Sequence, residues 1–290
     1  MPNKRQLDMV VISDVHLGTY GCRAKELLNY LRSIETERLI LNGDFIDIWQ
    51  FKKNYFPKEH MQVLHKVLKM AEQGTKVYYI TGNHDDRLRR YADLTTGNLF
   101  LRNQLTIRLN RKKYWIFHGD VFDLSVQYSP WIAKLGGKGY DYLILLNRLV
   151  NNIRTKLGKS EMSLAGKIKG SVKQAVKFVG DFEDKAIKLA AEKNYDYVIC
   201  GHIHCPQMRS VEKQGKRVIY LNSGDWVESL TALEYKWGQW SIYRYDPTDF
   251  EDANHSEDEE YPMNGTHSIS LFEQALRMAP DYEAAQKQLD

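Results

Sequence analysis

The sequence is poor in the features that mark several protein classes. Its three cysteines, Cys22, Cys200 and Cys205, provide neither a zinc-type pair nor an even set for disulfide bonds, so we expect a reducing, cytoplasmic compartment. No apolar run approaches the roughly 18 residues that cross a bilayer, and the polar residues before Met9–Ile12 do not resemble a secretory signal. No internal repeat is evident. These absences argue against disulfide-stabilised, membrane-spanning and solenoid proteins.

The charge of the chain is unevenly distributed. Hydrophobic residues make up 43% and charged residues 27% of the chain, as in globular proteins with a sizeable core, and the net charge is only +4. Residues 124–177, however, contain ten basic and two acidic residues, a local charge of +8. An acidic run at Ser256–Glu260 precedes one possible helix. We therefore expect a main domain over residues 1–245 with an insertion at about 124–177, then an acidic linker and C-terminal appendage over 246–290.

Short apolar runs alternate with helical patterns along the main domain. Strands are predicted at Met9–Ile12, Leu39–Leu41, Val77–Ile80, Tyr114–Phe117 and Tyr197–Cys200, and later at Arg217–Leu221, Leu230–Tyr235 and Trp240–Tyr245. Apolar residues three and four apart predict helices at Ala24–Ile34 and His60–Ala71. Strands that alternate with helices are typical of an α/β fold with a largely buried sheet. In such folds the loops at the carboxyl ends of the strands build the site.

Polar clusters follow the first five of these runs. They are Asp14-Val15-His16, Gly43-Asp44 with Asp47, Gly82-Asn83-His84-Asp85, His118-Gly119-Asp120 and Gly201-His202-Ile203-His204. One such cluster alone is an ordinary turn, because Asn, Asp and Gly favour turns. Together, however, the five clusters hold five of the nine histidines of the chain. Carboxylates combined with imidazoles suit Mn, Fe or Zn, so the pattern predicts a metal site where the strands end.

The spacing within the clusters suggests how the ligands converge. In an extended segment, the first and third residues of Asp14-x-His16 and of His202-x-His204 point to the same side. A glycine beside each cluster lets the backbone turn sharply and approach closely. Seven ligands are more than one ion needs and suit two ions about 3.5–4 Å apart that share a carboxylate. Such a pair generates hydroxide for in-line attack on phosphorus and neutralises charge on the phosphoryl oxygens.

These motifs, in this order and over residues 8 to about 225, resemble those of the calcineurin-like metallophosphoesterases. The resemblance implies a four-layer αββα sandwich with the site at its rim and a helical insertion that serves as a lid. It implies two divalent metal ions, with Mn expected and Fe or Zn as alternatives. On the matching positions, it implies that the first ion is bound by Asp14, His16 and His204, that Asp44 bridges, and that the second ion is bound by Asn83, His118 and His202.

The resemblance also implies a catalytic residue outside the ligand set. His84 matches the histidine of the family that contacts the phosphate and protonates the leaving oxygen. Asp85 is expected to orient His84, as carboxylates commonly do for imidazoles. Asp47 admits two interpretations, a site residue or the cap of the helix after it. Asp120 is a candidate for supporting a ligand from behind.

Three segments narrow the substrate. Ser13–Gly18, Gly43–Trp49 and Asn222–Trp226 resemble the branch that contains the UDP-2,3-diacylglucosamine diphosphatases of lipid A synthesis. That branch carries a helical insertion after the His-Gly-Asp motif as a lid over acyl chains, and this chain has its insertion at the same place. The implied reaction is hydrolysis to UMP and 2,3-diacylglucosamine 1-phosphate. In that branch the third motif reads Gly-Asn-Arg-Asp, so His84 matches the wider family instead.

Substrate contacts are expected from two places. The insertion mixes aromatic and aliphatic residues with positive charge, which suits an anionic lipid or a membrane surface. We therefore expect Trp131 and Tyr140 to contact a lipid-linked nucleotide sugar, and the protein to dock peripherally on the inner face of the cytoplasmic membrane. The alternative for the insertion is a solvated helical face. Arg87, Arg89 and Arg90 are expected to contact phosphates, although surface positions explain them equally well.

Other functions stay open at this point. Nucleic acid is not expected as a partner, because no nucleic-acid-binding motif is present. Another phosphodiester, a pyrophosphate or a phosphomonoester would use the same metal site as the lipid substrate. A non-catalytic scaffold of the same fold predicts lost ligands, whereas every expected ligand position is filled.

Overall fold

The computed structural model describes residues 4–48, 55–122, 164–213 and 215–250. The chain divides into two units, Met1–Tyr245 and Asp246–Asp290. Of the second unit only the first five residues are described, so residues 251–290 of the predicted acidic linker and appendage lie outside the described residues. Both β-sheets lie in the first unit.

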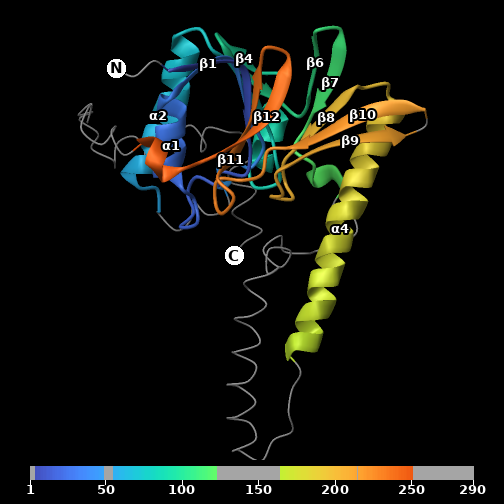
Figure 1. Cartoon of the computed structure of the whole chain (residues 1–290). Helices are drawn as coiled ribbons and strands as arrows, with labels where there is room; N and C mark the ends of the chain where they lie inside the picture. The colour runs from blue at the N-terminus through green and yellow to red at the C-terminus, as the bar shows by residue number, and fades with distance from the viewer. Residues whose placement is uncertain (1–3, 49–54, 123–163, 214, 251–290) are drawn as a thin grey trace, which may run out of the picture. The chain divides into compact units, whose positions relative to one another are not determined.

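The first sheet contains seven strands in the order β12-β11-β1-β2-β3-β5-β4 (Figure 1). The bounds of these strands are Arg5–Ile12 (β1), Ile34–Asn42 (β2), Lys76–Ile80 (β3), Thr95–Thr96 (β4), Leu99–Arg102 (β5), Thr231–Lys236 (β11) and Gln239–Arg244 (β12). The central strands β1, β2, β3 and β5 are parallel. Antiparallel strands extend the sheet on both sides.

The second sheet contains five strands in the order β6-β7-β8-β10-β9. Its strands span Leu105–Leu109 (β6), Lys112–Ile116 (β7), Tyr197–Cys200 (β8), Gln207–Lys213 (β9) and Lys216–Asn222 (β10). β7, β8 and β10 are parallel, and β6 and β9 flank them as antiparallel edges. Each sheet therefore has a parallel centre, whose strand ends point one way.

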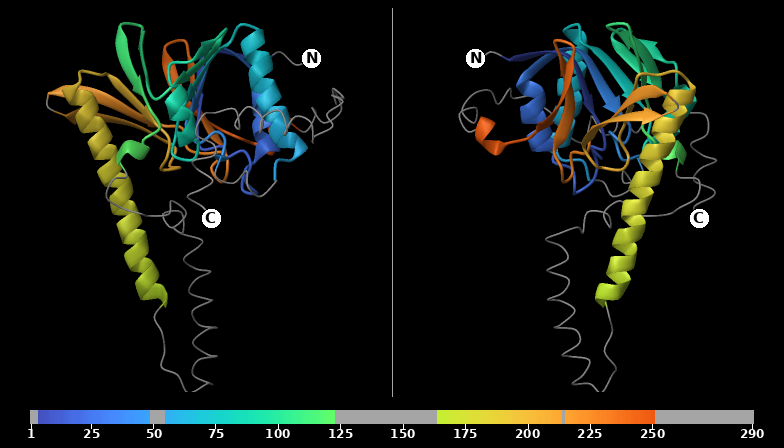
Figure 2. Two further views of the ribbon diagram at one scale, coloured as in Figure 1. Left: turned by 180° about the vertical axis from the view of Figure 1, so that it is seen from behind. Right: turned by 45° about the vertical axis from the view of Figure 1, so that its right-hand side comes forward.

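Helices cover the outer faces of the two sheets (Figures 1 and 2). Helices α1 (Ala24–Arg32) and α2 (Lys58–Glu72) lie against the first sheet, and α4 (Leu164–Glu192) lies against the second. Short 3-10 turns, η2 (Asp86–Tyr91) and η3 (Asp120–Phe122), come after β3 and β7. None of the helices in the described part of the chain is both long and apolar enough to cross a membrane.

Apolar side chains fill all three spaces between these layers. Met9 and Val11 of β1 belong to a buried cluster between the sheets that also contains Ile116 of β7. The alternate residues Val10 and Ile12 belong to the cluster that includes α1 and α2. Successive strand residues point to opposite faces, which explains why this strand reads as a continuous apolar run.

The third apolar cluster lies under α4. Phe182, Ala186 and Ile187 of the helix pack with Trp115 and Val218 of the second sheet, and all five are buried. The order of layers is therefore helix, sheet, sheet, helix. The predicted α/β class and four-layer αββα sandwich are confirmed.

The predicted elements correspond to observed ones, with four strands left unpredicted. All eight predicted strands and both predicted helices are present. The unpredicted strands are β4, which has two residues, together with β5, β6 and β9. Of these, β6 and β9 are half-exposed edges with polar residues on one face. The predicted end of the insertion at residue 177 falls inside α4, and residues 123–163 lie outside the described residues.

Candidate metal centre

Asp14 and His16 lie in the loop after β1 and have left-handed backbone conformations. The φ angle is +53° at Asp14 and +55° at His16. The backbone N–H of Asp14 donates to the Gly43 carbonyl (3.1 Å), and that of His16 donates to the Asp44 carbonyl (2.9 Å). The prediction of an extended segment is therefore wrong. A turn held against the loop after β2 brings both side chains to one place.

The same conformation recurs at three further predicted ligands. The φ angle is +52° at Asp44, +67° at His202 and +52° at His204. A left-handed conformation costs a residue other than glycine on the order of 1 kcal/mol, although Asp and His tolerate it better than most. Strained backbone tends to gather at functional sites. Its concentration in five predicted ligands therefore supports a site at this edge.

Two glycines leave room for these side chains. A Cβ atom on Gly43 would overlap the ring of His118, and a Cβ atom on Gly82 would overlap the carboxylate of Asp44. Gly43 also has a φ of +82°. The glycines beside the clusters are thus required by close approach.

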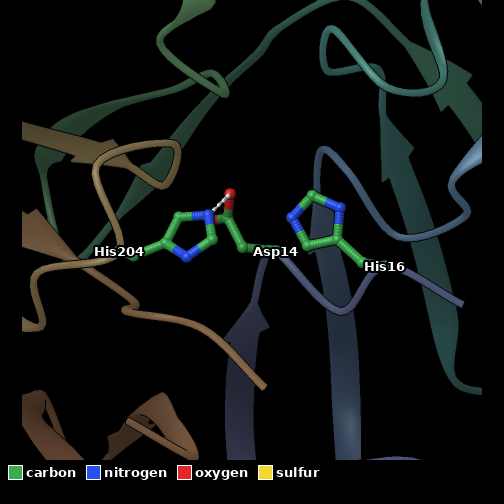
Figure 3. Close-up of side chains that lie close together, drawn as sticks. All are labelled: Asp14, His16 and His204. Atoms are coloured by element: carbon green, nitrogen blue, oxygen red, sulfur yellow. Dashed lines mark ion pairs between the residues drawn. The ribbon is translucent and has the colours of Figure 1, made fainter. Parts of the chain in front are cut away.

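Three overlapping groups of potential ligand atoms result. They are Asp14 with His16 and His204, Asp44 with His118 and His202, and between them His16 with Asp44 and His84. Within each group the ligand atoms lie within 4.8 Å of one another. Figure 3 shows the Asp14 carboxylate between the rings of His204 and His16. Two neighbouring sites linked by Asp44 are the arrangement that the sequence predicts.

The carboxylate of Asp14 is fixed on one side only. Its Oδ2 accepts a hydrogen bond of 2.9 Å from the backbone N–H of His202. Its Oδ1 lies 3.0 Å from Nε2 of His204, but it is buried without a well-aligned hydrogen bond. A buried carboxylate oxygen is stable only when a donor or a cation compensates it. Oδ1 of Asp14 therefore fits a metal ligand.

His118 supplies the corresponding observation on the second side. Its Nδ1 lies 2.9 Å from the Asn42 carbonyl, which can only accept, so Nδ1 carries the proton. Nε2 is buried, makes no aligned hydrogen bond, and lies 3.3 Å from Oδ2 of Asp44. When the His118 ring is neutral, the lone pair of its Nε2 faces the lone pairs of Asp44 Oδ2. A cation between them removes that repulsion, so the residues fit a divalent metal.

The electrostatics of the cluster point the same way. Burial alone would raise the pKa of Asp44, but His118 outweighs this effect and holds the pKa at about 2. Burial alone would lower the pKa of His118, yet Asp44 and Asp14 hold it well above its usual value. The pKa of Asp14 is likewise held far below its usual range by His204 and His118, against the effect of burial. The site thus stabilises positive charge.

Asn83 and His84 occupy the turn after β3. Asn83 is half-buried and directly succeeds Gly82. The backbone N–H of His84 donates to Oδ1 of Asp44 at 2.8 Å, and the His84 ring lies edge-on to that of His16 with centroids 4.7 Å apart. The seven predicted ligands and His84 therefore all lie in loops at one edge of the sheets, and their individual roles stay a prediction.

Asp47, and not Asp85, contacts the ring of His84. Nδ1 of His84 lies 3.0 Å from Oδ2 of Asp47. Asp85 instead accepts hydrogen bonds from the Tyr79 hydroxyl (2.7 Å) and from the backbone N–H groups of Gly82 (2.5 Å) and Phe45 (3.2 Å). The predicted orienting role of Asp85 is therefore not what the structure shows, because that carboxylate points into the fold.

Most of the residues predicted to contact the substrate either interact with other protein groups or lie outside the described residues. Arg89 forms an ion pair with Asp120 and donates to the Gly82 carbonyl at 3.2 Å. Nε of Arg90 donates to the Arg87 carbonyl at 3.2 Å, so these two lie together in η2. Trp131 and Tyr140, both in the insertion, lie outside the described residues.

Two residues that the sequence did not single out support the ligand loops. Nδ1 of His60 in α2 accepts the backbone N–H of Gly18 at 2.9 Å, two residues after His16. Oδ2 of Asp225, in the loop after β10, lies 3.9 Å from Nδ1 of His204. Asp225 stands in the Asn222–Trp226 motif, which was a usable signal. His60 carries no such signal, since a histidine on a helix is usually a packing residue.

Comparison with known proteins agrees with this geometry. The family model of the calcineurin-like phosphoesterases matches residues 7–206. This chain belongs to that family. The calcineurin-like phosphoesterases use divalent metals, and the chain is accordingly a metal-dependent hydrolase with candidate His and Asp sites for its ions.

Curated relatives of this phosphoesterase resemble it over most of their length. The UDP-2,3-diacylglucosamine hydrolase of Aliivibrio fischeri is 24% identical over 82% of this chain and 98% of its own. That of Wigglesworthia glossinidia brevipalpis is 25% identical over 79% of this chain and 90% of its own. A solved archaeal phosphodiesterase aligns with 81% of this chain and 98% of its own, at 12% identity and a TM-score of 0.41.

Proposed function

We propose that this phosphoesterase hydrolyses UDP-2,3-diacylglucosamine to UMP and 2,3-diacylglucosamine 1-phosphate. The observation that carries the proposal is the convergence of two ligand groups on Asp44 in a chain whose curated relatives bear that activity in their names. The match with those relatives extends over nine-tenths or more of their length.

The ligand groups suggest how two ions are held. Asp14, His16 and His204 would hold the first ion, and His118 and His202 the second, with Asp44 between the ions. Asn83 would join the second group, as the family resemblance implies. When bound, such ions supply a nucleophile at neutral pH and neutralise charge on the phosphoryl oxygens. Mn is the metal that we propose, with Fe or Zn as alternatives that the same donor set accepts.

His84 is proposed as the residue that protonates the leaving oxygen. Asp47 contacts Nδ1 of the His84 ring, so Nε2 is the ring nitrogen that we propose for proton transfer to the substrate. The side chain of His84 is 37% exposed, whereas that of Asp47 is only 3% exposed. The ring is thus accessible to a substrate on one side and held by a buried carboxylate on the other. This is the arrangement expected for a general acid.

The insertion and the basic residues support a lipid-linked substrate. The local charge of +8 over residues 124–177 complements the phosphates of the substrate and an anionic membrane surface. We propose that Trp131 and Tyr140 contact the acylated sugar, and that Arg87 and Arg90 lie near its phosphates. Peripheral contact with the inner face of the cytoplasmic membrane is proposed on the basis of the same charge, and a nucleic-acid partner is not proposed.

The proposal is tested by direct turnover. Purified protein with added Mn²⁺ is given UDP-2,3-diacylglucosamine, and UMP release is measured beside that of an Asp44→Ala variant. Release in the wild type that is lost in the variant supports both the chemistry and the substrate. No release by either protein, with the wild type cleaving bis(p-nitrophenyl) phosphate, would keep the metal centre and exclude the lipid substrate.

A second candidate is a different phosphodiester, pyrophosphate or phosphomonoester. The observation that favours it is His84 itself, because the branch that contains the UDP-2,3-diacylglucosamine diphosphatases has arginine at this position of the third motif. Turnover of the lipid substrate compared with that of the aryl phosphodiester separates the two candidates. A non-catalytic scaffold predicts that neither substrate is cleaved and that little metal is bound.

A further inference from the structure

Arg89 and Asp120 join loops from the two sheets at the edge of the metal centre. Arg89 lies in η2, after β3 of the first sheet, and Asp120 begins η3, after β7 of the second sheet. Their side chains form an ion pair, and Asp120 is only 12% exposed. The same Nη2 atom of Arg89 also donates to the Gly82 carbonyl. One guanidinium therefore contacts the loops of both sheets.

The two loops carry different ligands of the second predicted ion. Gly82 immediately precedes Asn83, and Asp120 lies two residues after His118. The backbone N–H of Gly201 donates to the His118 carbonyl at 3.0 Å, which connects the loop of His202 to the same group. The contacts of Arg89 thus bear on the positions of all three ligands.

Apolar packing between the sheets fixes the positions of these loops less well than polar contacts do. Between the sheets lie apolar side chains, whose packing is not directional. Asn42 ties His118 to the strand that leads to Asp44, through contacts with the ring Nδ1 of His118 and the Phe117 carbonyl. Arg89 provides the corresponding polar link between His118 and the turn of Asn83. Charge-assisted hydrogen bonds of this kind are about twice as strong as neutral ones.

We infer that the Arg89–Asp120 pair is a positioning device for the second metal ion, and that Arg89 is not a phosphate-binding residue. The inference rests on the proposed two-ion function. Nη2 of Arg89 already contacts both the Asp120 carboxylate and the Gly82 carbonyl, and Nε is buried without a hydrogen-bond partner, so these nitrogens do not face a substrate. A substrate phosphate would have to compete with that carboxylate.

The test measures metal affinity directly. Isothermal titration of the metal-free protein with Mn²⁺ gives the number of ions and a Kd for each, in the wild type and in Arg89→Ala. Changes behind metal ligands typically cost 10–100-fold in affinity. We expect the Kd of the second ion to rise at least about tenfold in Arg89→Ala, while that of the first ion stays within about threefold.

Arg209→Ala is the matched control. Arg209 also pairs with a carboxylate, that of Glu183, and its side chain is 37% exposed like that of Arg89. This pair joins β9 to α4, and neither residue belongs to a loop that carries a predicted ligand. The control should lose stability and keep both ions with unchanged affinity. If both variants lose the second ion equally, general destabilisation explains the effect and the inference fails.

A double-mutant cycle and a conservative variant complete the test. Asp120→Ala and the double variant should weaken the second ion by the same factor as Arg89→Ala, because the pair acts as one unit. Arg89→Lys keeps a charged nitrogen, so it should recover much of the affinity and serves if the alanine variant does not fold. Additive effects would contradict the inference.

Two outcomes separate this inference from the proposed function. If Arg89→Ala keeps both ions and raises KM for the phosphoester with kcat unchanged, Arg89 binds substrate and the inference is wrong. If the wild type itself binds fewer than two ions and cleaves no phosphoester, the proposed function fails first. Wild-type binding of two ions with loss of one in Arg89→Ala supports both.

Discussion

His84 Nδ1 lies 3.0 Å from Asp47 Oδ2, although the two residues are 37 positions apart in the sequence. They meet because β2 and β3 are parallel neighbours, which places the loops after these strands side by side. Asp85, the direct neighbour of His84, points into the fold instead. Two acidic residues near one histidine thus have different roles, and mutation can separate them.

Replacement of Asp47 should affect the rate more than the fold. In Asp47→Asn the ring of His84 loses its carboxylate partner, so we expect kcat to fall about 10–100-fold, as for other partners that orient a histidine. Asp85→Asn should instead lower stability, because Asp85 accepts three hydrogen bonds from within the fold. Steady-state kinetics and urea unfolding of both variants distinguish the effects. The opposite pattern would return the orienting role to Asp85.

Gly43 and Gly74 offer a matched pair for testing close approach. Both have a positive φ, +82° and +104°, so alanine at either position should cost about 1 kcal/mol in backbone strain. Only at Gly43 would the added Cβ meet His118, since nothing lies within 4 Å of a Cβ at Gly74. We expect Gly74→Ala to keep full activity, and Gly43→Ala to lose metal and turnover. Equal activity of the two variants would contradict the described geometry.

The buried histidine of α2 predicts a loss of stability at mildly acidic pH. Burial lowers the pKa of His60 to about 4, against about 6.5 in the unfolded chain. The unfolded state therefore binds more protons between these values, and stability falls as the pH drops from about 6.5 to 4, at no more than about 1.4 kcal/mol per pH unit. His60→Gln keeps an acceptor for the Gly18 N–H. Its free energy of unfolding, measured with urea at pH 7.5 and at pH 5, should fall less between these pH values than that of the wild type. Equal losses in the two proteins would contradict this prediction.

Metal addition should stabilise the wild type and leave an Asp44→Asn variant nearly unaffected. An ion that binds only the folded state adds about 2.7 kcal/mol at a hundredfold excess over its Kd. That corresponds to a rise in Tm of roughly 5–10 °C for a chain of this size. Thermal unfolding with Mn²⁺ and with EDTA measures it. Asn also tolerates the left-handed backbone of residue 44, so the comparison for each protein is its own Tm with and without metal.

The strand ends were predictable from the sequence because two local signals coincide there. A run such as Val77–Ile80 indicates a buried strand, and a polar cluster directly after it cannot continue that strand. Parallel order then brings several such ends to one edge. The predicted ligands Asp14 and His204 could therefore be expected to meet, as they do at 3.0 Å between Oδ1 and Nε2.

The backbone conformation and the pairings could not be predicted in this way. The φ of Asp14 is imposed by hydrogen bonds from a neighbouring loop, and no local pattern encodes such contacts. The partner of His84 depends on which carboxylate faces it across β2 and β3, and proximity in sequence favoured the wrong one. The engagement of Arg89 by Asp120 requires the packing of one sheet on the other.

The left-handed conformations at the predicted ligands have a consequence for the evolution of this sequence. At Asp14, Asp44 and His202, a glycine would relieve the backbone strain but would remove a predicted metal ligand. Backbone strain and the predicted metal binding thus pull in opposite directions at these positions. If selection for catalysis were removed, we expect these three positions to be among the first to be substituted. A descendant that had lost its chemistry would keep an intact sandwich, with glycine or asparagine where the ligands once stood.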